Sequence, residues 1–148
     1  MPNQFAIQLI EQHGSETTDS LFSEQHVGVF LVDWREADED IINMAAETLG
    51  TQELSSKWQD EKLYVCYKNQ MTLVPLMFEP GEQDKTLLAL NTALSPDYEV
   101  RHIRASEGGD TIAFMALDTG TWKNLESTFG KKVEDAFMSL AGGSSLFS

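Results

Sequence analysis

The sequence predicts an α+β fold, in which a largely antiparallel sheet has helices packed mainly on one face. Two observations support this prediction. Short runs rich in β-branched and aromatic residues come in pairs joined by turns, and a helical pattern of apolar residues follows each pair. The chain has 148 residues, 41% of them hydrophobic, which suits a single domain. We expect that domain to span residues 1–142, with a flexible tail at 143–148.

The first half of the chain holds two clear elements. Residues 27–33 read VGVFLVD, a pattern typical of a buried strand. Residues 37–49 carry apolar residues at helical spacing, and Gly50 is placed to end that helix in a left-handed conformation. The flanking segments are polar, so we expect a loop with a short turn at 14–25 and a linker at 51–61.

Residues 5–10 fit two structures. Phe5, Ile7 and Leu9 alternate as a strand would, whereas the whole apolar set also fits one face of a helix. We favour the helix because Pro2 suits its first turn and Gly14 suits its end.

The second half is more regular. Its predicted elements, in chain order, are strands at 62–67 and 71–78, a helix at 82–94, strands at 98–105 and 111–117, and a helix at 121–141. The strand at 98–105 has no cleanly apolar face and is expected at an edge, whereas 111–117 is apolar throughout and is expected in the centre. The apolar stripe of the last helix stays in phase across Gly130, which favours one helix over two, with Thr121 as its N-cap.

A weak internal repeat runs through these elements. Three strands end in an acid, at Asp33, Glu79 and Asp118, and an amphipathic helix follows each. If residues 5–10 were a strand, the chain would read as three strand-strand-helix units.

Acidity is the strongest compositional signal. The formal net charge is −14, and residues 1–61 hold 13 acids against 2 bases, a net of −11. Such a surface repels phosphate backbones and anionic lipid, so we expect neither direct nucleic-acid binding nor membrane binding. Self-repulsion that keeps the protein soluble is the simplest interpretation of the charge.

The single cysteine bears on the cellular compartment. Cys66 has no second cysteine with which to pair, and it suits a small apolar position in a strand. Residues 1–10 lack the basic stretch and cleavage site of a signal peptide, and the longest apolar run, 71–78, is too short to cross a bilayer. These features predict a reducing cytoplasm of the bacterial type.

One triplet resembles a catalytic motif. Asp118-Thr119-Gly120 after an apolar strand is the signature of aspartic proteases, whose chemistry needs two carboxylates that share a proton. The chain holds one copy, and helix-like sequence follows it. We therefore expect the triplet to form a turn and cap where a strand joins a helix.

The densest acidic run lies around the start of the predicted helix at 37–49. It allows three interpretations: a solvated helix start, whose dipole favours acids, a hard-cation site, or a docking patch for a basic partner. The run lacks the ligand spacing and central glycine of an EF-hand loop. Its acids, with two tryptophans near chain breaks that suit interface anchors, form the predicted partner-binding set: Asp33, Trp34, Glu36, Asp38, Glu39, Asp40 and Trp58.

No motif indicates a cofactor or a metal. His13, His26 and His102 are scattered without ligand spacing, and no phosphate-binding glycine loop or GxSxG sequence occurs. We therefore predict no catalytic residue, no bound metal and no cofactor.

From residue 62 onward the element order resembles small acidic type III secretion chaperones and YbjN-like domains. The matching stretches are 87–91, the turn at 107–110 and 117–137. The helix at 37–49 and the linker to residue 61 depart from that family's pattern. The resemblance implies a homodimer that wraps an extended, often basic, segment of a partner and performs no chemistry.

The leading hypothesis is therefore a non-catalytic protein-binding module that acts as a chaperone, adaptor or inhibitor. One alternative is a DNA mimic whose carboxylates imitate phosphates and compete with duplex DNA for a DNA-binding protein. Another is an enzyme with dispersed site residues, which should show a concave pocket with converging polar groups.

Overall fold

A computed structural model describes residues 3–11, 15–140 and 146–147. It contains two antiparallel sheets, which confirm the predicted α+β class with largely antiparallel strands. The four-stranded sheet has the order β1 (Val29–Asp33), β6 (Thr111–Asp118), β5 (Tyr98–Ile103), β7 (Phe137–Ser139), and the three-stranded sheet has the order β2 (Leu54–Gln59), β3 (Lys62–Tyr67), β4 (Gln70–Leu73).

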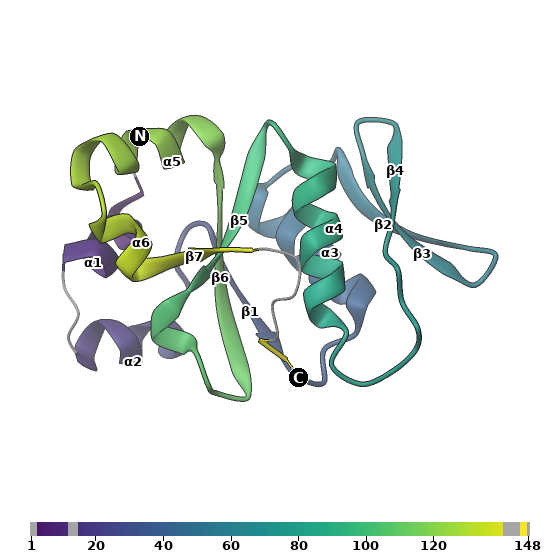
Figure 1. Cartoon of the computed structure of the whole chain (residues 1–148), viewed down its shortest axis with the longest axis horizontal. Coiled ribbons are helices and arrows are strands. Elements are labelled where there is room, and N and C mark those ends of the chain that lie inside the picture. The colour runs from purple at the N-terminus through teal and green to yellow at the C-terminus, as the bar shows by residue number, and fades with distance from the viewer. Residues whose placement is uncertain (1–2, 12–14, 141–145, 148) are drawn as a thin grey trace.

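Six α-helices and one 3₁₀ turn complete the described part of the chain. They are α1 (Gln4–Glu11), α2 (Ser15–Ser23), α3 (Asp38–Leu49), α4 (Gln83–Leu94), the 3₁₀ turn Arg104–Ser106, α5 (Thr119–Phe129) and α6 (Lys132–Ala136). Helices α3 and α4 lie between the two sheets, whereas α1, α2, α5 and α6 gather on the far side of the four-stranded sheet (Figure 1).

Helices therefore cover both faces of the four-stranded sheet, which differs from the predicted packing mainly on one face. The reason lies in β6, which is apolar on both faces. Ile112 and Phe114 belong to the core shared with α3, α4 and the small sheet. Ala113 and Met115 belong to a second core under α1, α5 and α6. Each face needs its own cover because exposed apolar area costs about 25 cal/mol per Å².

The predicted helix at 121–141 is wrong in its second half. Helix α5 ends at Phe129, because Gly130 has φ of +60° and ψ of −130°, and the chain resumes as α6 and then as strand β7. Strand β7 pairs with β5 from Arg101 to Ile103. Strand β5 consequently lies between β6 and β7, and its predicted edge position is also wrong.

Two segments predicted to be irregular are regular. The predicted linker at 51–61 contains β2, and the predicted loop at 14–25 contains α2. Strand β2 was missed because Leu54 is its one buried residue, so it shows no alternation of apolar and polar side chains. The hairpin to β3 turns on Asp60 and Glu61, both at positive φ.

The N-terminal segment is helical, as favoured over a strand. Phe5, Ala6, Leu9 and Ile10 are buried on one face of α1. The proposed repeat of three strand-strand-helix units required a strand at residues 5–10. Because this segment is a helix, the first unit lacks its first strand. The predicted strand at 71–78 shortens to β4, and Pro75 lies beyond its end.

The C-terminal prediction splits into two parts. Residues 143–145 and 148 of the predicted tail lie outside the described residues. Leu146 and Phe147 instead pack against the first core, and the Phe147 ring stacks on Phe114 with centroids 6.3 Å apart. The backbone N–H groups of both residues donate to the Asp84 carboxylate, each at 3.3 Å.

Candidate functional site

The predicted partner-binding residues lie around the N-terminus of α3. Strand β1 ends at Asp33, Trp34 to Glu36 form the connection, and the next acids occupy the first helical turn. Trp58 reaches this turn from β2, and its Nε1 donates a hydrogen bond of 2.8 Å to Oε2 of Glu39. The structure thus brings the two ends of the predicted set together.

Both tryptophans are accessible. Trp34 is 55% exposed and Trp58 is 44% exposed. The Arg35 guanidinium lies 5.6 Å from the centre of the Trp34 ring and also pairs with Asp33 at 3.3 Å. The Arg35 backbone N–H and side chain hold the pKa of Asp33 below its ordinary value. Asp33 therefore stabilises the loop before α3, and part of its hydrogen-bonding capacity is taken by Arg35.

Asp38 is the acid of the first turn that packs inward. Its Oδ1 accepts a hydrogen bond of 2.7 Å from the Thr86 hydroxyl of α4. Burial raises the pKa of Asp38, and the nearby charge of Glu82 raises it further, whereas the Thr86 bond lowers it. The N-termini of α3 and α4 therefore meet at this carboxylate, while Asp40 stays exposed to solvent.

Sequence reasoning missed the other half of the site, which comes from the loop before α4. The carboxylate of Glu82 accepts the backbone N–H of Met77 at 2.8 Å and that of Glu79 at 2.8 Å, and it pairs with Lys85 at 3.7 Å. Burial acts to raise the pKa of Glu82, but these donors outweigh it and the pKa falls below its ordinary value. Glu82 thus organises the loop against the helix.

Gln83 joins the two halves and carries an unsatisfied group. Its Nε2 donates to the backbone oxygens of Trp34 at 2.6 Å and Glu36 at 3.4 Å. Its Oε1 is buried and has no hydrogen-bond partner among the described residues. A buried acceptor without a donor costs about 1–3 kcal/mol, so such groups are rare and call for an explanation.

A cavity of about 380 Å³ opens between these elements. We name it the acceptor pocket; the residues that define it are Trp34, Asp38, Glu79, Glu82, Gln83 and Phe147. Three carboxylates, one amide and two aromatic side chains line it, and its lining includes no lysine or arginine. Its volume falls in the range of small-ligand sites, and its polar groups are predominantly hydrogen-bond acceptors.

Exposed apolar side chains lie beside the acceptor pocket. Met77 is 68% exposed and Phe78 is 73% exposed, and both belong to the loop that Glu82 holds. Phe78 has φ of +60°, a backbone conformation that bulky residues rarely adopt. The sequence offered a weak signal here, since an apolar run continues past Pro75 to a Glu-Pro-Gly break.

The Asp-Thr-Gly triplet forms a helix cap, as predicted. Asp118 is the N-cap of α5, and its carboxylate accepts the backbone N–H of Thr121 at 3.0 Å and the Thr121 hydroxyl at 2.6 Å. The Thr121 hydroxyl is the main cause of a lowered pKa at Asp118. The predicted cap residue, Thr121, is therefore the donor to the cap.

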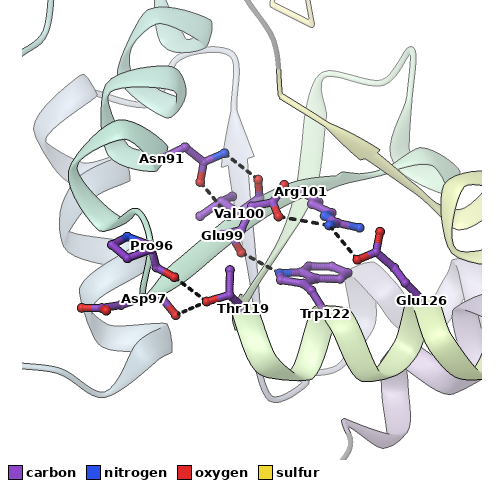
Figure 2. Close-up of polar contacts among 9 residues, drawn as sticks. All are labelled: Asn91, Pro96, Asp97, Glu99, Val100, Arg101, Thr119, Trp122 and Glu126. Atoms are coloured by element: carbon purple, nitrogen blue, oxygen red, sulfur yellow. Dashed lines mark hydrogen bonds and ion pairs between the residues drawn. The ribbon is translucent and has the colours of Figure 1, made fainter.

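A second polar cluster surrounds the start of α5 (Figure 2). The Arg101 guanidinium lies 4.2 Å from the centre of the Trp122 ring and pairs with Glu99 at 3.0 Å and Glu126 at 3.6 Å. The Trp122 indole donates to the Glu99 backbone oxygen at 2.9 Å. We name this group the closed cluster, because the Arg101 side chain is only 10% exposed.

Amide and hydroxyl side chains fasten the closed cluster to its neighbours. The Asn91 side-chain amide donates to the Val100 backbone oxygen at 2.9 Å, and its oxygen accepts the Val100 backbone N–H at 2.7 Å (Figure 2). The Thr119 hydroxyl donates to the Asp97 backbone oxygen at 3.0 Å. These bonds tie α4 to β5, and the start of α5 to the residues that precede β5.

The two histidines that the structure describes, His26 and His102, do not form a ligand set. His102 is fully buried on β5, and neither ring nitrogen has a partner among the described residues, so burial lowers its pKa. His26 stacks on Phe5 with centroids 3.5 Å apart, and His13 lies outside the described residues. In the part of the chain that the structure describes, no three His, Cys, Asp or Glu side chains form a metal-binding group.

Tyr67 forms a separate polar contact with Asp97, in which its hydroxyl donates at 2.8 Å and Lys68 donates at 2.7 Å. Burial and this bond raise the pKa of Tyr67 to about 12. The phenol therefore stays protonated near neutral pH and is unsuited to act as a base.

Comparison of the chain with family models, curated proteins and solved structures found no match. None of the described helices is long and apolar enough to cross a bilayer.

Proposed function

We propose that this protein is a non-catalytic, cytoplasmic protein-binding module that recognises a basic segment of another protein through the α3 N-terminus. The observation that carries the proposal is the acceptor pocket, which gathers carboxylates and aromatic side chains beside exposed Met77 and Phe78. Clusters of aromatic anchors with complementary charge are typical of protein interfaces.

Charge supports the choice of a basic partner. The chain carries −14, and the half that contains α3 carries most of that excess. Opposite charges accelerate encounter and select partners, and the attraction weakens with salt because the Debye length is about 8 Å at physiological ionic strength. Retention of a true partner should therefore fall as salt rises.

The test compares two charge-reversed variants of equal net charge. Glu36→Lys with Asp40→Lys reverses the α3 approach and leaves the Asp38–Thr86 bond in place. Glu24→Lys with Glu47→Lys makes the same charge change elsewhere, at exposed acids that form no ion pair with another described residue. The immobilised proteins are incubated with native lysate, and retained proteins are identified by mass spectrometry.

We expect the wild type and the Glu24/Glu47 variant to retain the same basic protein, and the Glu36/Asp40 variant to lose it at an unchanged melting temperature. If both variants lose the retained protein equally, the interaction depends on net charge and not on the α3 N-terminus. Competition by duplex DNA for the retained protein would instead favour the DNA-mimic alternative.

A further inference from the structure

The acceptor pocket includes one buried hydrogen-bond acceptor, the Gln83 Oε1, that no group of the described residues satisfies. Gln83 lines the cavity and is only 7% exposed, and its Oε1 has no donor in the part of the chain that the structure describes. Asp38 and Glu79 line the same cavity, and neither forms an ion pair with a described lysine or arginine. A ligand that completes this pocket must therefore donate hydrogen bonds and carry positive charge.

We infer that the acceptor pocket binds the guanidinium group of an arginine side chain, supplied by the basic partner of the proposed function, on which this inference rests. A guanidinium offers five N–H donors in one plane and stacks on aromatic rings. The pocket supplies the matching parts: the carboxylates of Asp38 and Glu79 and the partly exposed ring of Trp34, with the buried Gln83 amide in its wall.

The chain itself contains a filled site of the same composition. In the closed cluster, Arg101 lies against Trp122 and pairs with two glutamates (Figure 2). The acceptor pocket has the tryptophan and the acids without an arginine between them. This internal precedent shows that the fold accepts a guanidinium between an indole and carboxylates.

The nearby cations of the chain are already engaged. Arg35 pairs with Asp33 and lies over the Trp34 ring at 5.6 Å from its centre, and it is not among the residues that line the cavity. Lys85 pairs with Glu82 at 3.7 Å. A metal ion fits less well, because the described residues form no group of three ligands here and metals prefer several converging oxygens.

The test titrates the full-length, ¹⁵N-labelled protein with three capped tripeptides, acetyl-Gly-Arg-Gly-amide and its lysine and citrulline counterparts. Citrulline keeps the shape of arginine and lacks its charge. We expect the arginine peptide to cause saturable shifts of the Trp34 indole and Gln83 side-chain NMR signals. The lysine peptide should bind several-fold more weakly, and the citrulline peptide should give no saturable shift.

Matched variants locate the site. Glu79→Gln should raise the Kd of the arginine peptide by at least about fivefold, because it removes a charged acceptor. Trp34→Leu should weaken binding by a similar factor. The controls are Glu47→Gln, an exposed acid on the same helix as Asp38, and Phe22→Leu, an accessible aromatic residue of α2; each should change Kd less than twofold.

Saturable shifts that map away from the acceptor pocket, or equal weakening by Glu47→Gln and Glu79→Gln, would overturn the assignment. If the arginine peptide fails to bind while a basic partner is still lost on reversal of Glu36 and Asp40, the guanidinium site is wrong and the proposed function stands. If the peptide binds and no basic partner is retained, the pocket is real and the proposed function is wrong.

Discussion

The closed cluster and the acceptor pocket each combine a tryptophan with carboxylates at the start of a helix. They differ in whether an arginine of the chain lies between these groups. At α5, Arg101 fills the space between Trp122 and two glutamates and leaves little of itself exposed. At the junction of α3 and α4, Trp34 stays accessible and no arginine lines the cavity. Buried atoms without a partner among the described residues occur at both places, the Gln83 Oε1 and the Arg101 Nε. We therefore assign a structural role to the closed cluster and a binding role to the acceptor pocket.

The largest expected difference lies between the two tryptophans. Trp122 is 1% exposed and packs against Phe137 with ring centroids 5.1 Å apart. Trp122→Ala should lower the free energy of unfolding by about 4 kcal/mol, because it opens a cavity in the second core. Trp34→Ala should lower it by less than about 0.5 kcal/mol, since exposed side chains contribute little.

Urea unfolding followed by circular dichroism measures both changes, with the m-value checked for constancy. A cost at Trp34 close to that at Trp122 would make the acceptor pocket a part of the folding core. The comparison between a closed and an open group would then fail.

The second prediction removes the cation of the closed cluster. Arg101→Met keeps a long apolar side chain on the indole and should cost about 2 kcal/mol, because it leaves Glu99 and Glu126 without their partner. These two carboxylates are partly exposed, which keeps the cost below that of a fully buried pair. The matched control is Lys123→Met, an exposed cation of α5 whose loss should cost less than about 0.5 kcal/mol.

Equilibrium unfolding at low and high salt provides the measurement. An Arg101→Met variant as stable as the wild type would show that the guanidinium contributes nothing at α5. The precedent for an arginine in the acceptor pocket would then lose its weight.

The sequence predicts one side of the acceptor pocket and misses the other for a definite physical reason. The acids of α3 and Trp34 stand out because they are close together in the chain, next to a helix start that favours negative charge. Glu79 and Gln83 arrive through packing of α4 against α3, and no local pattern encodes that contact. Trp58 reaches Glu39 through β2, a strand whose polar residues hide its periodicity.

In the fold, too, elements determined by local sequence could be predicted, whereas elements determined by contacts between distant residues could not. Helices α3 and α4, with Gly50 as a left-handed cap, follow from periodicity and end signals, and α1 follows from its apolar periodicity, since Pro2 and Gly14 lie outside the described residues. Strand β7 does not, because the apolar stripe of residues 121–141 keeps its phase while Gly130 redirects the backbone. Pairing with β5 then decides the conformation of Phe137 to Ser139.

The smallest expected effect concerns His102, a buried side chain whose two ring nitrogens have no partner among the described residues. His102 is fully buried beside the first core, with its ring 6.0 Å from that of Phe114. His102→Leu should raise the free energy of unfolding by about 1 kcal/mol at neutral pH, because it replaces an unpaired polar ring with an apolar side chain.

The pH dependence of this variant gives an independent check. Burial lowers the pKa of His102 in the folded state, whereas the unfolded chain titrates near the ordinary value of about 6.5. The unfolded state therefore binds more protons below that pH, and the wild type should lose stability as pH falls from about 7 towards 5. The difference in stability between His102→Leu and the wild type should widen over this interval. A constant difference would mean that the His102 ring has a hydrogen-bond acceptor in the folded protein. Gln83 and Arg101 would then be the remaining buried polar side chains with an unsatisfied atom among the described residues.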